Sequence, residues 1–220
     1  MAAIYDCSAP TELLTGMRLA RSAIGRGDLV VVPTDTVYGL AADAFSPRAV
    51  QRLLDAKGRT RQSPPPVLIP STATLEALAT DIPDAARSLV EEFWPGGLTL
   101  ILQATPSLAW DLGDTGGTVA LRMPADDLAL ELLADTGPLA VSSANLTGEP
   151  AAMTAANAVA MLGDSVSVYL DGGPRTGGLA STIVDATDHS GLLRIVRQGA
   201  VSAESLRAIV GDSLHAESGA

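Results

Sequence analysis

The sequence has 220 residues, of which 47% are hydrophobic and 18% charged, and this composition excludes an intrinsically disordered chain. Its net charge of -11 argues against non-specific nucleic-acid binding through the overall field, although a local basic patch is compatible with it. One cysteine and two histidines exclude an intrachain disulfide and zinc sites built from Cys and His.

The first residues lack the basic start and the apolar stretch of a signal peptide, and no apolar run is long enough to span a membrane. We therefore expect a cytoplasmic protein without membrane association. In the absence of repeats or a Pro/Ser-rich linker, the sequence predicts a single domain over residues 1–210. Residues 211–220 lack periodicity, which predicts a flexible C-terminal tail.

Helices and strands are predicted from hydrophobic spacing, caps and turn residues. In chain order these are a helix over 13–24, a strand over 29–32, a helix over 47–57, a strand over 67–69, a helix over 82–93, strands over 98–102 and 118–122, a helix over 126–133, a strand over 139–142, a helix over 154–162, strands over 166–170, 182–185 and 192–196, and a helix over 202–210. Because the two types alternate, the fold class is predicted to be α/β. Hairpin-like turns at 95–97 and 171–173 predict a twisted, mixed sheet with parallel and antiparallel strands.

Polar side chains gather where predicted strands end. Thr34, Asp35 and Thr36 directly follow the strand over residues 29–32, and three oxygen-bearing side chains at such a place can bind a polar ligand. The same residue types are typical of turns and helix caps. This segment by itself leaves both interpretations open.

Three cations follow the helix over residues 47–57, namely Lys57, Arg59 and Arg61. Arg binds phosphate oxygens through its planar fork and Lys adds a point charge, so the segment is a candidate anion-binding loop. The alternative is a solvated turn that complements the helix dipole. Because basic residues are scarce in this chain, we favour a ligand phosphate. We expect Lys57→Ala and Arg59→Ala to fold normally, since exposed loop charges rarely support stability.

Further candidates lie near the later strands. Residues 141–148 carry two hydroxyls and an amide, which line a polar site or form a local turn. The glycines of residues 171–178 let backbone approach a ligand closely, but the Gly-Lys-Ser/Thr ending of a P-loop is missing. Arg122 and Arg197 lie near strand ends, where an Arg beside a polar cleft binds carboxylate or phosphate and an Arg on the surface is merely solvated.

Seven stretches of the chain match one family in its own order. They are VPTDTVYGL (32–40), AKGR (56–59), FWPGGLT (93–99), TVALR (118–122), SANLTG (143–148), STIVD (181–185) and RQGA (197–200). Each is weak alone, but together they are specific and extend over about residues 28–201. The chain therefore resembles the threonylcarbamoyl-AMP synthases of the bacterial Sua5/YrdC type.

The resemblance implies a YrdC-like fold, in which a twisted mixed sheet and flanking helices surround a concave site. It also implies an enzyme, a nucleotidyltransferase that makes L-threonylcarbamoyl-AMP and pyrophosphate from L-threonine, bicarbonate and ATP. The product would supply the N6-threonylcarbamoyl modification of adenosine 37 in tRNA (t6A37). A separate transferase complex completes that step, so direct tRNA binding is expected to be weak or absent. Mg²⁺ is expected on the ATP phosphates, without a metal site in the protein.

The resemblance also assigns roles to residues of this sequence. Lys57 and Arg59 are implied to be catalytic, through contacts with the nucleotide phosphates. The implied threonine-binding residues are Thr34, Arg122 and Ser181, with Arg122 as the partner of the carboxylate. The implied ATP-binding residues are Lys57, Arg59, Ser63, Thr118, Ser143, Asn145, Ala151 and Arg197.

The sequence departs from the family pattern in three places. Residues 62–66 (QSPPP) stand where the family often has Asn-Pro-Leu, and no histidine follows on the threonine side. Val141 replaces the first serine of a Ser-x-Ser-Ala-Asn pattern. The second domain of longer family members is not expected here.

Three other interpretations remain. A double-stranded RNA-binding or ribosome-assembly module could use a basic concave face of the same fold, but the net charge of -11 argues against this role. A carbamoyl-transfer domain like those of hydrogenase maturation proteins is the second, and an α/β domain with a degenerate site is the third.

Overall fold

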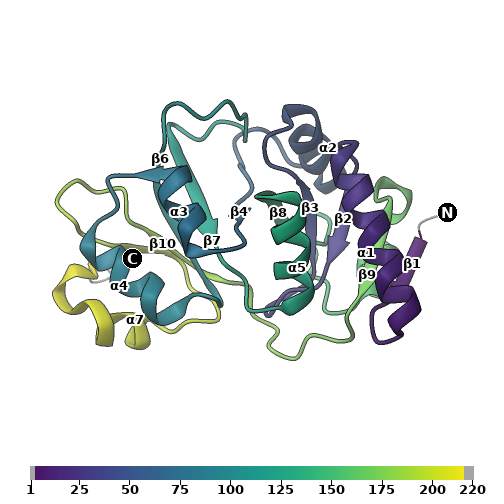
Figure 1. Cartoon of the computed structure of the whole chain (residues 1–220). Coiled ribbons are helices and arrows are strands. Elements are labelled where there is room, and N and C mark those ends of the chain that lie inside the picture. Colours follow the sequence, from purple (N-terminus) through teal and green to yellow (C-terminus); the bar gives the residue numbers. More distant parts are fainter. Residues whose placement is uncertain (1–2, 216–220) are drawn as a thin grey trace.

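The computed structural model describes residues 3–215, which form an 11-stranded sheet flanked by helices (Figure 1). The strands are β1 (Ala3–Asp6), β2 (Val30–Val32), β3 (Gly39–Asp43), β4 (Val67–Leu68), β5 (Ala79–Thr80), β6 (Leu98–Ala104), β7 (Thr118–Arg122), β8 (Leu139–Ser143), β9 (Val168–Asp171), β10 (Thr182–Asp185) and β11 (Arg194–Arg197). The helices are α1 (Pro10–Gly25), α2 (Pro47–Lys57), α3 (Thr72–Leu78), α4 (Asp84–Phe93), α5 (Asp127–Thr136), α6 (Ala155–Leu162) and α7 (Ala203–Val210), with short 3₁₀ helices η1 (Gly163–Ser165) and η2 (Gly211–Ser213). None of the described helices is long and apolar enough to cross a membrane.

The strand order across the sheet is β1-β9-β2-β3-β8-β4-β7-β6-β10-β11, and β5 pairs with β6 at the side. Four pairs are parallel: β1 with β9, β9 with β2, β4 with β7 and β6 with β10. The other pairs, such as β2 with β3 and β6 with β7, are antiparallel. The predicted α/β class and mixed sheet are therefore confirmed.

In the first half of the strand order, β9, β2 and β3 are covered on both faces, whereas the edge strand β1 leaves Ile4 and Asp6 exposed. Val30 and Val32 of β2 face a cluster with α1 and α5, whereas Val31 between them faces a second cluster with α2 and α6. Both faces of these strands are therefore apolar, as expected of strands buried between two helical layers. In Figure 1 this half, with α1, α2 and α5, lies to the right.

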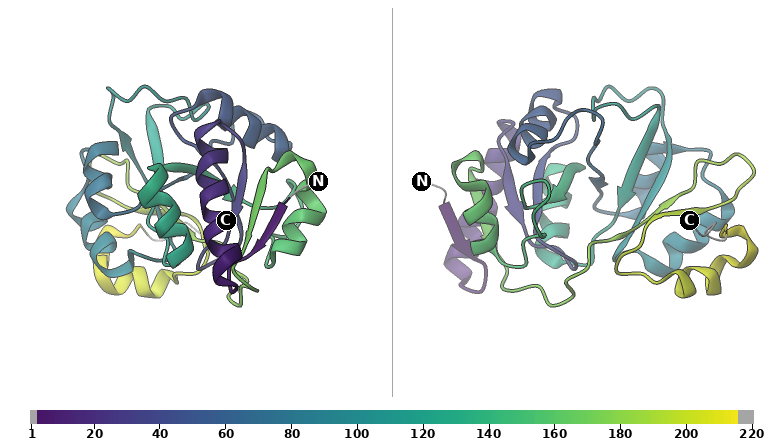
Figure 2. Two further views of the ribbon diagram at one scale, coloured as in Figure 1. Left: turned by 45° about the vertical axis from the view of Figure 1, so that its right-hand side comes forward. Right: turned by 180° about the vertical axis from the view of Figure 1, so that it is seen from behind.

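The second half of the strand order, β7-β6-β10-β11, has helices on one face. The side chains of Leu98, Leu100 and Leu102 in β6 point to a core shared with α3, α4 and α7. These helices lie together at the left of Figure 1 and reappear on the right when the molecule is seen from behind (Figure 2). The alternate residues of the same strands point to the opposite face. That face carries the candidate site.

The structure corrects several details of the sequence-based expectations. β1, β3, β5 and α3 were not predicted. The turn at residues 171–173 is not a hairpin, because β9 pairs with β1 and β2 whereas β10 pairs with β6 and β11. The turn at 95–97 joins α4 to β6 and is not a hairpin either. Several antiparallel pairs, namely β2 with β3, β6 with β7 and β10 with β11, join consecutive strands, whereas the parallel pairs join strands far apart in the sequence.

The expected flexible tail is wrong for its first residues. Gly211–Ser213 forms η2, and Leu214 is 4% exposed and pairs in a bridge with Leu193. The burial of Leu214 in the core with α4 and α7 explains why this segment packs onto the domain. Residues 216–220 of the expected tail lie outside the described residues.

Candidate active site

A cavity of about 280 Å³ lies on the face of β6, β7 and β10 that no helix covers. Strand alternation selects the side chains that reach it. The cavity-facing residues on or next to these strands include Thr99, Ile101, Thr118, Ala120, Arg122, Ser181 and Ile183. Leu98, Leu100, Leu121 and Val184 alternate with them and belong to the core that faces the helices. None of the described residues that line the cavity is Asp or Glu. The cavity is therefore a largely apolar hollow whose charged lining side chains are all cationic.

Arg122, the last residue of β7, is 6% exposed and fixed on three sides. Its Nε donates to the carbonyl of Gly96 at 2.8 Å, Nη1 to Thr36 Oγ1 at 3.0 Å, and Nη2 to Asp35 Oδ1 at 2.7 Å. A guanidinium has five N–H groups. Among the described residues, these contacts leave one N–H on each terminal nitrogen for a ligand.

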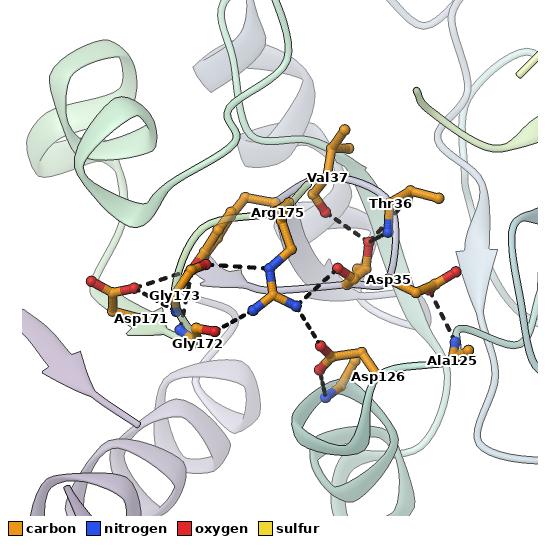
Figure 3. Close-up of polar contacts among 12 residues, drawn as sticks. Asp35, Thr36, Val37, Ala125, Asp126, Asp171, Gly172, Gly173 and Arg175 are labelled. Carbon is orange, nitrogen blue, oxygen red and sulfur yellow. Dashed lines mark hydrogen bonds and ion pairs between the residues drawn. The ribbon is translucent and has the colours of Figure 1, made fainter. Parts of the chain in front are cut away.

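Burial lowers the pKa of the Arg122 guanidinium, and the Asp35 carboxylate counteracts this effect. An Arg stays protonated in proteins because its ordinary pKa is so high. The Asp35 Oδ1 also accepts a hydrogen bond from the Ala125 backbone N–H at 2.9 Å (Figure 3). The carboxylate is thus held from two sides and presents Arg122 in one orientation toward the cavity.

Two more arginines lie on the cavity wall. Arg197 donates through Nη2 to the Ser181 carbonyl at 2.6 Å and to Ser181 Oγ at 3.2 Å, while Thr99 and Ser181 share a hydrogen bond of 2.8 Å. Arg59 also lines the cavity and donates through Nη1 to Ser142 Oγ at 3.3 Å. Burial lowers the pKa of Arg197, and the positive charge of Arg59 lowers it further. Two repelling cations in one cavity favour an anionic ligand between them.

Lys57, the last residue of α2, is the only lysine of the sequence and is 1% exposed. Its ammonium donates to the carbonyls of Ser143 and Asn145 and, at 3.2 Å, to Asn145 Oδ1. Burial, together with repulsion from Arg59, lowers the pKa of Lys57 to about 8. The expectation that Lys57 is an exposed loop cation is therefore wrong. Its ammonium links the end of α2 to Ser143, the last residue of β8, and to Asn145 just after it.

The third expected loop cation also has a protein partner. Arg61 forms two hydrogen bonds with Asp111, of 2.7 and 3.1 Å. The Trp110 ring stacks on Phe45 with 5.5 Å between centroids, next to this ion pair in sequence. Leu112 and Thr115 of the same loop line the cavity. These contacts fasten the loop before β7 to the first half of the sheet.

A model of the family Sua5_yciO_yrdC, described as "Telomere recombination", matches residues 22–199. A putative threonylcarbamoyl-AMP synthase of Mycobacterium leprae is 50% identical over 208 residues, which are 94% of each chain. The chain belongs to the Sua5/YciO/YrdC family. The threonylcarbamoyl-AMP synthase of Bacillus subtilis is 37% identical over 91% of this chain and 58% of its own length.

A solved member of the Sua5/YciO/YrdC family has the same fold. The structure of Pyrococcus abyssi Sua5 in complex with L-threonine superposes with a TM-score of 0.86 at 33% identity. The match covers 96% of this chain and 61% of the Sua5 chain. The expected YrdC-like architecture is thereby confirmed.

Most of the predicted site residues of this Sua5/YciO/YrdC member meet at the cavity. Those that line it are Thr34, Arg59, Thr118, Arg122, Ser143, Ser181 and Arg197. Lys57 and Asn145 are buried beside it and bind each other. Ser63 is exposed and Ala151 is half-buried, and neither is among the lining residues. Binding roles for these residues stay predictions.

Two contributions were not predicted from the sequence. Thr99 lines the cavity, and Asp35, which the sequence placed only in a candidate ligand-binding segment, holds Arg122. Thr36 of the same segment lines the cavity. Alternation along the strand over residues 98–102 was the signal that would have singled out Thr99.

Residues that depart from the family pattern also line the cavity. Pro64, Pro65 and Pro66 line the cavity together with Leu68 and Val141, and they make this part of its wall apolar.

Proposed function

We propose that the chain is a threonylcarbamoyl-AMP synthase, a nucleotidyltransferase that makes L-threonylcarbamoyl-AMP and pyrophosphate from L-threonine, bicarbonate and ATP. The observation that carries this proposal is one cavity lined by three arginines and, among the described residues, by no carboxylate. We assign Arg122, held by Asp35 and Thr36, to one cationic region of this cavity, and Arg59 and Arg197 to the other. The 50% identical M. leprae relative bears the same activity in its name.

The reaction joins two anions, so the cavity must neutralise charge and align the reactants. Bicarbonate first condenses with the threonine amine to give a carbamate and water. A carbamate oxygen then attacks the α-phosphorus of ATP, the bond to the β-phosphate oxygen breaks, and pyrophosphate leaves. No protein nucleophile takes part, which agrees with a cavity wall of hydroxyls, arginines and apolar groups.

In this proposal Arg122 binds the threonine carboxylate through its two remaining N–H groups, beside Thr34 and Ser181. Arg59 and Arg197 bind phosphate oxygens, and Thr118 and Ser143 contact the nucleotide. Lys57 acts indirectly, because its three acceptors are protein oxygens of Ser143 and Asn145. It positions the segment that carries Ser143.

Mg²⁺ would enter with the substrate as Mg·ATP. The polar side chains of the lining carry hydroxyls or guanidinium groups, whereas Mg²⁺ sites in proteins generally include carboxylates. The triphosphate and water would therefore supply most of its ligands.

The product would be passed to a separate transferase complex that modifies adenosine 37 of tRNA. The acidic net charge of -11 favours this division of labour over direct RNA binding.

Pyrophosphate release tests the proposal. The purified chain is incubated with Mg·ATP, with and without L-threonine and bicarbonate, and L-serine replaces L-threonine in a parallel reaction. Release that requires both co-substrates, and that is much slower with serine, supports the synthase. Release without threonine, or none under any condition, contradicts it.

A further inference from the structure

Arg175 lies in the segment that joins β9 to β10, outside the set of residues that line the cavity. Its side chain is 16% exposed and forms an ion pair with Asp126, with 2.9 Å between Nη1 and Oδ2. The same Nη1 contacts the Thr34 carbonyl at 3.3 Å, and the other nitrogens donate to the carbonyls of Gly172 and Gly173. Figure 3 shows the guanidinium at the centre of this network.

These contacts join two loops that flank the amino-acid end of the cavity. Asp126 is the N-cap of α5, since its Oδ1 accepts from the Ala129 N–H at 3.1 Å. Thr34 begins the turn that continues into Asp35 and Thr36, both of which hold Arg122. Arg175 therefore fixes the turn through its backbone, while Arg122 contacts the side chains of the same turn.

The surroundings of Arg175 are shaped for an arginine. Its guanidinium carbon lies 5.6 Å from the centre of the Tyr38 ring, a position suited to a cation–π contact. A Cβ atom on Gly172 would lie 2.9 Å from Pro33 Cγ and 3.0 Å from Arg175 Nη2. The glycine thus permits the close approach of this segment to the turn. A lysine would keep the charge but lose the planar fork that reaches several acceptors at once.

We propose that Arg175 is a positioning residue for L-threonine. It fixes the turn of residues 34–36 against the N-terminus of α5, and this turn orients Arg122 for the substrate carboxylate. This inference rests on the proposed function. Arg175 contacts the turn that holds Arg122 and does not itself line the cavity. Its replacement should therefore raise KM for threonine and leave KM for ATP unchanged.

The test compares Arg175→Gln and Arg175→Lys with matched changes at Arg194. Arg194 also pairs with an Asp on a neighbouring segment, at 3.0 Å from Asp185, but it is 70% exposed and remote from the turn. KM for L-threonine, KM for ATP and thermal unfolding are measured for each variant. We expect Arg175→Gln to raise KM for threonine by about tenfold, since small misplacements in a site have effects of this order. KM for ATP should stay near the wild-type value, Arg175→Lys should be intermediate, and both Arg194 variants should behave like wild type.

A double-mutant cycle with Asp126→Asn isolates the proposed path. Asn remains a good N-cap, so this change removes the charge and keeps the cap of α5. The effects of Asp126→Asn and Arg175→Gln on KM for threonine should be strongly non-additive. Additive effects would overturn the inference, and so would equal increases of both KM values in proportion to lost stability.

Pyrophosphate release by the wild type is a separate arm of the test. Its absence would contradict the proposed function, and this inference with it, whereas an active wild type and an unaffected Arg175→Gln would overturn the inference alone.

Discussion

The Arg122 guanidinium and the Asp35 carboxylate form a buried ion pair, with 2.7 Å between Nη2 and Oδ1 and side chains that are 7% and 18% exposed. The pair joins the end of β7 to the turn after β2, two segments that are distant in sequence. Because Asp35 also accepts from the Ala125 N–H at 2.9 Å, the pair is fixed before any substrate binds. A site that is fixed in advance loses little entropy when it binds its ligand.

Replacing Asp35 should lower the free energy of unfolding more than replacing Arg122. Asp35→Asn leaves the Arg122 charge buried without a counter-ion, so we expect a loss of about 3 kcal/mol in the free energy of unfolding. Arg122→Gln leaves an Asp35 that keeps the Ala125 N–H and more contact with water, so we expect about 1–2 kcal/mol. Denaturant unfolding of both variants measures the difference. Equal losses would argue against a buried, uncompensated Arg122.

The activity of Arg122→Gln should separate the two substrates. Loss of a charged hydrogen-bond donor to the threonine carboxylate corresponds to about 10- to 100-fold in KM for threonine. KM for ATP should change little, since the nucleotide is assigned to the other cationic region. Steady-state kinetics with each substrate varied in turn provides the test. A change confined to KM for ATP would reverse the assignment of the two regions.

Arg59→Gln is the counterpart on the nucleotide side. Arg59 is half-buried, and among the described residues its side chain makes only long hydrogen bonds, of 3.3 Å to Ser142 and 3.4 Å to Thr147. Its removal should therefore change the free energy of unfolding by no more than about 0.5 kcal/mol. Its loss also relieves repulsion on Arg197. We expect a higher KM for ATP and a smaller rise in melting temperature on addition of ATP. A wild-type response to ATP would remove Arg59 from the site.

Lys57 offers a direct check on the environment behind the cavity. Because it is the only lysine, protein labelled with ¹³Cε-lysine should show a single lysine side-chain signal in an NMR titration. Burial and repulsion from Arg59 lower the pKa of Lys57 to about 8, so the midpoint should lie near pH 8. A midpoint near the ordinary value of 10.5 would show an exposed ammonium.

The same shift predicts how stability changes with pH. Between pH 8 and 10.5 the unfolded chain keeps the Lys57 proton and the folded chain has released it. Rising pH in this window therefore favours the folded state, and below pH 8 the cost of burying the charge is fully present. Lys57→Met lacks this dependence. The free energy of unfolding of the wild type minus that of Lys57→Met should increase from pH 8 to 10.5, and a flat or falling difference would contradict the prediction.

Local patterns in the sequence were sufficient for most elements and for much of the site. Ser46 followed by Pro47 predicted the start of α2, where Ser46 Oγ does accept from the Ala49 N–H. β3 escaped prediction because its sequence, GLAAD, has none of the β-branched residues typical of strands. It is a strand because β2 and β8 flank it and bond its backbone. The pairing with β8 joins segments far apart in sequence, and no local pattern encodes it.

The sequence by itself determined the family, the alternating α/β class and many of the residues that line the cavity, because these depend on residue types and their spacing. Only the tertiary structure decided which cations face the cavity. Lys57 and Arg59 are two residues apart, yet Lys57 is buried against the carbonyls of Ser143 and Asn145 while Arg59 lines the cavity. The physical reason is that a buried ammonium requires several oxygen acceptors. Here a strand 86 residues further along the chain supplies one of them.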